Sequence, residues 1–466
     1  MKNLKLQYSL ALVAGLFSFD GHSQIQFDLM HTDPSCSYNG FQKTFCHGQN
    51  DTKAADLRSG MVDKINAQLD RTLKNPSQAK VYIAYFSMSN KNVHKKICQI
   101  LSKGVAVEIV LDRGSVANVS DLQKNPACAG VDTSSPSSKL KVAYLGGLTS
   151  QPWRLHHNKF LFVDPGVGQS VNVNFSSGNL SAFGTSLHLD HWVTMVAPKT
   201  SNLVKSYECV IEGLRAAISF ANSAGGHQAS NDSQVAQRYI QSREACFGHK
   251  NVMGSSQIEQ AIAREGIASM FAPNNDDIVH RTFVNEISRV PANGYIYIAI
   301  QHFLHRGIGQ ALVNASRKGV DVRIIMDDDV VTNKGEVQGA QSFLEGLKSQ
   351  APRIMVRYIE TNRNAGGNGS MMHNKFALLN GNRVLSGAGQ YTGAAMRNNW
   401  ENFGLTQVPI LNQKYAKYFK SLWNVSVDEN YVRAQLPYNE DINASHAQPS
   451  IATPAVLNAN FLNLAK

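Results

Sequence analysis

The chain repeats its own pattern after about 215 residues, and this duplication restricts the folds that it can adopt. The apolar run KVYIAYF at 80–86 is echoed by YIYIAIQ at 295–301. Each run is rich in β-branched and aromatic residues, as buried strands are, so both are expected to be central strands. Apolar residues at helical spacing follow each run, and then come a glycine and a second apolar run. The repeated order of strand, helix and strand predicts two similar α/β lobes.

The register of the repeat extends beyond this first unit. Gly104 and Gly319, which end the two expected helices, lie 215 positions apart, and so do Asp112 and Asp327 at the ends of the next strands. Further matched segments are third short strands at 140–144 and 355–358 and trailing helices at 203–217 and 414–423. In each lobe we therefore expect a mixed β-sheet flanked by helices.

The repeat also sets the expected domain boundaries within the 466 residues. A stretch rich in Ser, Gly, Asn and Gln at 223–233 is typical of a loop between the halves. The expected parts are a signal peptide (1–23), a cysteine-containing extension (24–55), lobe 1 (56–222), a linker (223–255), lobe 2 (256–430) and a C-terminal tail (431–466).

The first residues have the pattern of an export signal. Lys2 and Lys5 precede an apolar run at 10–19, and small or polar residues follow it. The run is short of the roughly 20 apolar residues that a membrane-spanning helix needs. We therefore expect a secreted or periplasmic mature protein; a retained N-terminal core helix is the alternative.

The six cysteines are expected to form structural disulfides, because an exported chain meets an oxidising compartment. Two local pairings, Cys36–Cys46 and Cys209–Cys246, are hypotheses among many possible connectivities. No C-x-x-C motif occurs, so the sequence gives no support to a zinc ribbon or a thioredoxin-like redox site.

The net charge is strongly positive. Its formal value is +11 at pH 7. A field of this sign attracts polyanions, which include both nucleic acid and anionic membrane surfaces. The charge therefore bears on the encounter with a substrate and does not choose between these two classes.

Two polar pairs interrupt apolar segments at matching positions. His157 and Lys159 lie in HHNKFLFVD at 156–164, and His373 and Lys375 lie in HNKFALLN at 373–380. On a strand, residues two positions apart point to the same face, so each motif places an imidazole beside an ammonium. A polar pair on an otherwise buried strand is costly unless it faces a functional site.

With these motifs the chain resembles the phospholipase D superfamily, whose mark is a duplicated H-x-K-x4-D followed by a segment similar to G-S-x-N. The resemblance covers about 350 residues and both lobes. It implies one active site at the interface between two phospholipase D-like lobes. By this resemblance the expected catalytic residues are His157, Lys159, Asp164 and Asp190 in lobe 1, and His373, Lys375 and Glu401 in lobe 2. Ser177, Asn179 and Gln390 match the phosphate-binding positions, and Asn380 matches a structural position of the motif.

The resemblance also implies a mechanism without a metal or any other cofactor. His157 is expected to attack phosphorus and form a phosphohistidine, while His373 protonates the leaving oxygen and then activates water. Asp190 is expected to orient His157, and Glu401 to orient His373. The groups expected to bind the phosphoryl oxygens are Lys159, Lys375, Ser177, Asn179 and Gln390.

The second motif departs from the family pattern at three positions. Asn380 replaces the expected Asp, Ala388 the expected Ser, and Gln390 the expected Asn. If the Asp is a structural anchor, Asn380 can form similar hydrogen bonds; if the Asp tunes the charge of the site, lobe 2 is weakened.

Other polar clusters are interpreted as structural. We expect His156, His188 and His191 to be surface or hydrogen-bonding histidines, so no metal ligand is predicted. The run Asp327-Asp328-Asp329 is expected to be a turn at a strand end, as at Asp112.

The reaction type is better defined than its substrate. We expect phospholipase D-type hydrolysis of phospholipid headgroups, with a membrane surface as the partner and a monomeric protein. A metal-independent endonuclease acting on DNA or RNA is the alternative, and an inactive phosphodiester-binding protein is a minor one.

Overall fold

The computed structural model describes residues 25–33, 60–116, 122, 124, 128, 138–146, 154–226, 231–248, 255–275, 277–332, 338–359 and 371–434. The expected signal peptide and the cysteines Cys36 and Cys46 lie outside these residues. No described helix is long and apolar enough to span a bilayer.

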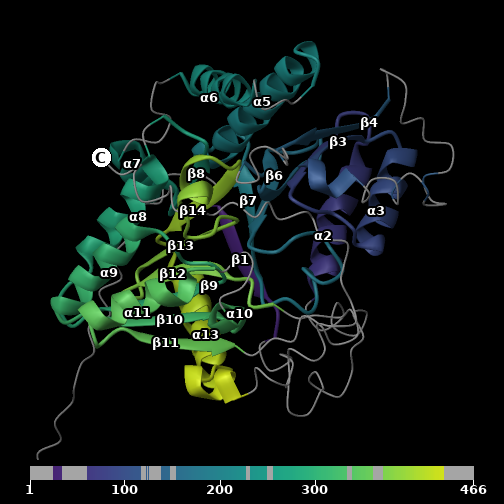
Figure 1. Cartoon of the computed structure of the whole chain (residues 1–466). Coiled ribbons are helices and arrows are strands. Elements are labelled where there is room, and N and C mark those ends of the chain that lie inside the picture. The colour runs from purple at the N-terminus through teal and green to yellow at the C-terminus, as the bar shows by residue number, and fades with distance from the viewer. Residues whose placement is uncertain are drawn as a thin grey trace, which may run out of the picture.

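The chain forms two lobes of alternating strands and helices (Figure 1). Lobe 1 contains β1 (Gln26–His31), α2 (Met61–Asp70), η3 (Arg71–Lys74), β2 (Lys80–Tyr85), α3 (Lys91–Ser102), β3 (Ala106–Asp112), η4 (Arg113–Ser115), β4 (Leu140–Leu145), β5 (Lys159–Asp164), β6 (Ser170–Ser176), β7 (His191–Pro198), α5 (Asn202–Ser223) and α6 (Asp232–Phe247). Lobe 2 contains α7 (Ser255–Glu265), β8 (Ile267–Ala272), α8 (Ile278–Arg289), β9 (Tyr295–Ile300), α9 (Arg306–Arg317), β10 (Asp321–Asp327), α10 (Asp329–Thr332), α11 (Ala340–Gln350), β11 (Met355–Ile359), β12 (Lys375–Leu379), β13 (Arg383–Gly387), α12 (Gly393–Arg397), β14 (Glu401–Thr406) and α13 (Pro409–Val425).

Each lobe is built on a seven-stranded mixed sheet, and the two sheets have the same topology. The strand orders are β4-β3-β2-β5-β6-β7-β1 and β11-β10-β9-β12-β13-β14-β8. In both sheets the first three strands are parallel and the others pair antiparallel. The predicted mixed α/β fold is confirmed, and β2 and β9, each third in its sheet, are interior strands as expected.

The first helix of each repeat begins and ends through the same devices. Asn90 caps α3 by accepting hydrogen bonds from the backbone N–H groups of the first turn, and the His305 side chain accepts one at the equivalent position before α9. Gly104 and Gly319 follow the two helices with φ of 89° and 95°, in the left-handed region that favours glycine. The predicted glycine stops are therefore confirmed.

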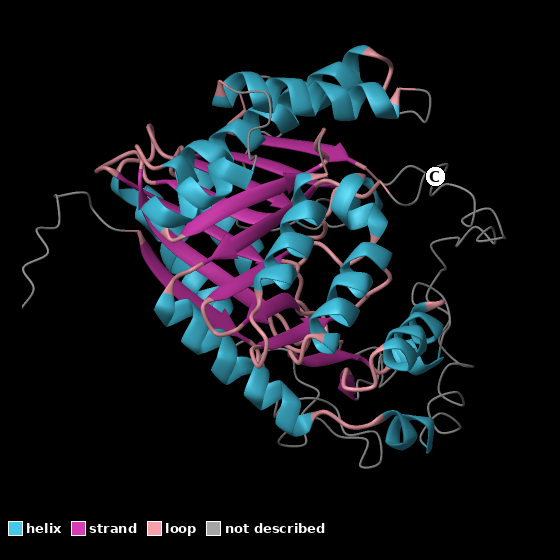
Figure 2. Ribbon diagram, turned by 90° about the vertical axis from the view of Figure 1, so that its left-hand side faces the viewer, coloured by secondary structure: helices cyan, strands magenta, loops and turns pink. Residues whose placement is uncertain are grey.

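The apolar cores show how the lobes are joined. One core lies between the lobe 1 sheet and α2 and α3, and another lies between the lobe 2 sheet and α8, α9 and α11. A third core contains side chains of both sheets together with α5, α6 and α13; Phe160 and Phe175 of lobe 1 and Phe376 and Trp400 of lobe 2 all belong to it. Figure 2 shows the strands in the interior, between helices. The shared core makes the interface between the lobes a permanent part of the fold.

Two segments differ from the expectation. The predicted linker at 223–255 contains a full helix, α6, which packs along α5 and is joined to it by the predicted Cys209–Cys246 disulfide. The extension at 24–55 contributes β1, an edge strand paired antiparallel with β7. A second disulfide, Cys98–Cys128, was not predicted. The polar composition of α6 and β1 concealed these two elements in the sequence, because α6 buries only one face and β1 is half exposed.

Two glycine substitutions test this account of the helix ends. Gly319→Ala should lower the free energy of unfolding by about 1–2 kcal/mol, because it places a Cβ in the left-handed region. Gly346→Ala, inside α11 with no atom within 4 Å of the added Cβ, should raise it by about 0.5–1 kcal/mol. Denaturant unfolding of the full chain measures both changes in the free energy of unfolding. Equal changes would contradict the assignment of Gly319 to a helix end that requires glycine.

Candidate active site

The two His-x-Lys motifs lie at the start of equivalent strands, β5 and β12, which are the middle strands of the two seven-stranded sheets. Lys159 and Lys375 are the first residues of these strands and are almost completely buried. Each ammonium donates to the backbone carbonyl of its own motif histidine, Lys159 to His157 at 3.3 Å and Lys375 to His373 at 2.7 Å. The expected pairing of imidazole and ammonium is present in both lobes.

Reciprocal backbone bridges bring the two motifs together across the lobe interface. The N–H of His157 donates to the carbonyl of Trp400 at 2.9 Å, and the N–H of His373 donates to that of Leu189 at 3.1 Å. These contacts belong to two short parallel bridges, His156 with Trp400 and Leu189 with Met372. Each motif is thus held against the segment that begins a strand of the other lobe.

The carboxylates that contact the histidines come from the opposite lobe. His157 Nδ1 lies 2.8 Å from Glu401 Oε2, and His373 Nδ1 lies 2.9 Å from Asp190 Oδ1. The predicted partners, Asp190 for His157 and Glu401 for His373, were therefore exchanged. The bridges explain the exchange. Asp190 follows Leu189 and Glu401 follows Trp400, and Leu189 and Trp400 are the residues that pair with the motif of the other lobe.

Burial disfavours the charged form of both imidazoles. Desolvation lowers the pKa of His157 and of His373 well below the usual value, and the ammonium groups of Lys159 and Lys375 lower the pKa of both further. The two histidines also lie in one electrostatic environment, because His373 itself lowers the pKa of His157. A neutral ring that donates from Nδ1 to a carboxylate has its Nε2 lone pair available for attack or for accepting a proton.

The same burial acts on the other charged groups of the site. It raises the pKa of Glu401 to about 8, although Lys159 and Lys375 act in the opposite direction. It lowers the pKa of Lys375 to about 8 and that of Lys159 well below its usual value. The pKa of Asp190 is raised for the same reason. A site of this kind therefore suits an anionic ligand that would stabilise both ammonium groups.

The three expected phosphate-binding groups have different surroundings. The Ser177 hydroxyl is fully buried and donates to Asp190 Oδ1 at 2.7 Å, so it positions the carboxylate and does not face a ligand. Asn179 is half exposed, and its Oδ1 has no hydrogen-bond partner among the described residues. Gln390 donates to Gln301 Oε1 at 2.6 Å and accepts from the N–H of His302 at 3.0 Å. A phosphate-binding role therefore remains a proposal for Asn179 and Gln390, and Ser177 is assigned to positioning Asp190 instead.

The last position of each motif lies away from the histidines, at the far end of β5 or just after β12. Asp164 pairs with Lys199 and accepts a hydrogen bond from the N–H of Gly166, so its predicted catalytic assignment is corrected to a turn residue. Asn380 and Gly381 have φ of 49° and 71° and form the two central residues of a tight hairpin turn. Asparagine tolerates this conformation, which explains the departure from the family pattern as a structural one.

Several residues that shape the site were not predicted from the sequence to contact it. The carboxylates of Asp112 and Asp327 accept the N–H groups of His156 and Met372, at 2.9 and 2.7 Å. Each also accepts an N–H two residues along its own chain, as the predicted strand-end turn requires. Their identical spacing in both repeats was the signal for this positioning role.

Asparagines of lobe 2 fix the lobe 1 motif in the same way. Asn402 Oδ1 accepts the N–H of Lys159 at 2.7 Å, and Asn399 Oδ1 accepts the N–H of Leu155 at 2.9 Å. Asn399 also donates to Glu401 Oε1 at 3.2 Å. No local pattern predicts these contacts, because they join residues more than 240 positions apart.

The two halves of the site differ where their walls meet the histidines. Phe86, just after β2, makes an edge-type contact with the His157 ring at 5.3 Å between ring centres, and the Lys159 ammonium lies 5.6 Å from the centre of the Phe86 ring. The equivalent position in lobe 2 is Gln301, which accepts the hydrogen bond of Gln390. This position of the wall is therefore aromatic beside His157 and polar in lobe 2.

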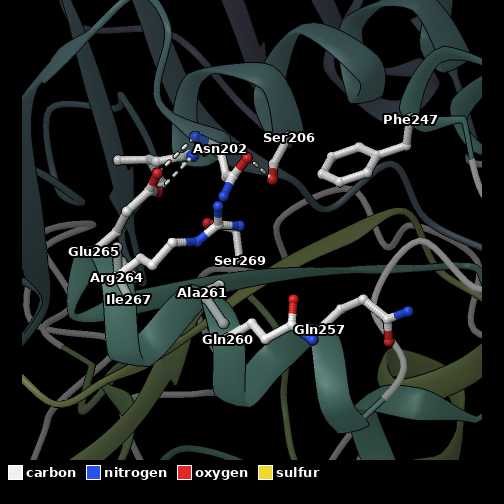
Figure 3. A pocket seen from close by; sticks show the side chains of 12 residues that line it. Asn202, Ser206, Phe247, Gln257, Gln260, Ala261, Arg264, Glu265, Ile267 and Ser269 are labelled. Atoms are coloured by element: carbon white, nitrogen blue, oxygen red, sulfur yellow. Dashed lines mark hydrogen bonds between the residues drawn. The ribbon is translucent and has the colours of Figure 1, made fainter.

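A cavity between α5 and α7 lies outside this site (Figure 3). Its lining contains none of the predicted site residues. The Glu265 carboxylate accepts the backbone N–H groups of Asn202 and Leu203, at 2.7 and 2.9 Å, and so caps α5. This arrangement stabilises the helix start and has no link to the histidines.

Comparison with known proteins supports the family resemblance. The family model described as "Cardiolipin synthase, PLD-like domain" matches residues 286–423, which include the second motif. This match supports membership of the phospholipase D superfamily. A solved phosphatidylserine synthase from Haemophilus influenzae shares the fold, with a TM-score of 0.51 and 11% identity over 83% of this chain and 90% of that one.

Two curated relatives are similar over part of their length. A mitochondrial cardiolipin hydrolase of Danio rerio is 29% identical over 133 residues, 28% of this chain and 52% of the relative. The protein of the same name from Xenopus laevis is 27% identical over 151 residues, 32% of this chain and 63% of the relative. The chain thus spans between half and two thirds of these relatives. Their names contradict the expected secreted or periplasmic location, because both relatives are mitochondrial.

The contact between Asn402 and Lys159 gives a test of the interface. Asn402→Ala should lower the free energy of unfolding by about 1–3 kcal/mol, because it leaves the buried N–H of Lys159 without a partner. Asn424→Ala, on the exposed side of α13, is the matched control and should change stability by less than about 0.5 kcal/mol. Denaturant unfolding compares the two; a small effect at Asn402 would mean that this bond does not hold the lobes.

Proposed function

We propose that this protein hydrolyses the headgroup phosphodiester of phospholipids through a covalent phosphohistidine. The observation that carries the proposal is the pair of buried imidazoles, each held at Nδ1 by a carboxylate of the other lobe. Two such groups are sufficient for double displacement at phosphorus, one as the nucleophile and one as the acid and base.

The surroundings of the histidines support distinct roles for them. In the proposed first step His157 Nε2 attacks phosphorus, the bond from phosphorus to the headgroup oxygen breaks, and a protonated His373 gives its proton to that oxygen. The phenyl ring of Phe86 beside His157 disfavours a charged imidazole there, which suits a nucleophile. In lobe 2 the equivalent position is Gln301, which is hydrogen-bonded to Gln390, so the aromatic ring is absent from the half-site of the proposed acid His373.

The second step reverses the proton transfer. The neutral His373 left by the first step takes a proton from water, and the resulting hydroxide attacks phosphorus and breaks its bond to His157. Lys159 and Lys375 stabilise the negative charge that spreads over the phosphoryl oxygens, with Asn179 and Gln390 as additional donors. Throughout, Glu401 and Asp190 hold the rings in the tautomer that leaves Nε2 reactive.

The choice of a lipid substrate is supported by the names of the relatives, which are cardiolipin hydrolases. A lipid of this class carries phosphodiesters on an anionic membrane surface, and the net charge of +11 favours contact with such a surface. The same charge would favour nucleic acid, so a nuclease remains the second candidate.

One assay separates these substrates. In EDTA, the full chain should release headgroups from vesicles that contain cardiolipin or phosphatidylglycerol, and His157→Ala should lose at least about 1,000-fold of the rate because the nucleophile is gone. Single- and double-stranded DNA are assayed in parallel. DNA cutting without headgroup release would replace the lipid proposal with the nuclease, and no reaction on either substrate would contradict both.

The raised pKa of Glu401 predicts how the rate depends on pH. His157 becomes a nucleophile when Glu401 is ionised and accepts the Nδ1 proton, and burial raises the pKa of Glu401 to about 8. Below this pH the carboxyl holds its proton, so kcat/KM should fall about tenfold per pH unit on the acid side. Glu401→Gln should lower the rate and remove this limb. An acid limb that persists unchanged in the variant would assign the titration to another group.

A further inference from the structure

Three potential metal ligands lie together on the lobe 2 side of the site. One ligand atom each of His188, Asp190 and His373 lies within 4.8 Å of the other two. Two imidazoles and a carboxylate are a donor set that zinc uses where it keeps a coordination position open. His188 is half exposed on the segment before β7, so an ion can reach the cluster from solvent.

The Asp190 carboxylate has unused capacity for such an ion. Its Oδ1 accepts from both the Ser177 hydroxyl and His373 Nδ1, at 2.7 and 2.9 Å. Its Oδ2 is buried and has no hydrogen-bond partner among the described residues. A buried carboxylate oxygen without a donor is costly, and a bound cation would remove that cost.

The other half of the site provides a natural comparison. The position equivalent to His188 in lobe 2 is Asn399, whose amide donates to Glu401 at 3.2 Å. No group of three candidate ligands occurs around His157 in the described part of the chain. The metal-type donor set is therefore a property of one half-site and not of the duplicated fold.

We propose that Zn²⁺ binds reversibly to His188, Asp190 and His373 and inhibits the protein by holding the His373 imidazole. Zinc ligands at about 2.0–2.1 Å from the metal lie roughly 3.3 Å apart in a tetrahedron, so small side-chain rotations complete the site. Lys375 and Lys159 oppose a cation here, and the carboxylates of Asp190 and Glu401 offset them. Binding of the ion is independent of the proposed function, whereas the inhibition rests on it.

The binding test uses the full chain without a histidine tag. Titration with Zn²⁺ by calorimetry, and with Co²⁺ by its visible tetrahedral absorption, should show one site. His188→Asn, which copies the residue of the other half-site, should weaken both by at least about tenfold, because it removes one of three ligands. His280→Asn is the matched control: it alters another close pair of imidazoles, His280 and His305 with ring centres 4.3 Å apart, and should leave binding unchanged.

A gain of binding provides the complementary test. Asn399→His places an imidazole beside Glu401 and His157 and should create a second Co²⁺ site of similar absorption. The proposal is overturned if the unmodified chain binds neither ion, or if His188→Asn binds as tightly as the unmodified chain.

Activity measurements then separate inhibition from binding. On the phosphodiester that the chain cleaves, Zn²⁺ should suppress the rate, EDTA should restore it, and His188→Asn should keep its rate in Zn²⁺. Equal zinc inhibition of the two proteins would overturn the inhibitory role. A chain that binds Co²⁺ through His188 but cleaves no substrate would contradict the proposed function and leave the metal site supported.

Discussion

The site depends on the exchange of backbone hydrogen bonds between the lobes. The bridges at His156 with Trp400 and at Leu189 with Met372 are short, yet they decide which carboxylate reaches which imidazole. Because each lobe supplies the carboxylate of the other, neither lobe alone contains a complete histidine and acid pair. The shared apolar core, which contains side chains from both sheets, is what makes these polar contacts permanent.

This arrangement also explains why two lysines can be buried. An ammonium moved out of water is costly unless it is hydrogen-bonded and faces opposite charge. Lys159 and Lys375 each donate to a backbone carbonyl, and Glu401 and Asp190 raise the pKa of both, opposing the effect of desolvation. The remaining cost lowers both pKa values, so an anion that enters the site gains from charges the fold has already positioned.

Much of the fold could be predicted because the repeat constrains it. Matching positions such as Gly104 and Gly319 fixed the helix ends, and the apolar runs around Ile83 and Ile298 identified the central strands. The pairing of histidines with carboxylates could not be obtained in this way. A repeat shows that two residues are equivalent, but it does not show which lobe each one contacts, and that depends on the packing of the two sheets. The half-exposed α6 was missed for a simpler reason, because its polar face hides the helical pattern.

Duplication gave the two half-sites one geometry, and the differences between them lie in the residues around the shared elements. Phe86 of lobe 1 is equivalent in the repeat to Gln301 of lobe 2, and His188 is equivalent to Asn399. The first difference places a polar side chain in lobe 2 where lobe 1 has an aromatic ring, and the second places an extra imidazole near His373 where the other half-site has an amide. A double displacement needs this asymmetry, because one histidine must stay neutral to attack while the other carries a proton. The imidazole of His188, which has no counterpart in the His157 half-site, also offers a ligand to a metal ion, so the proposed sensitivity to zinc follows from the same difference between the half-sites.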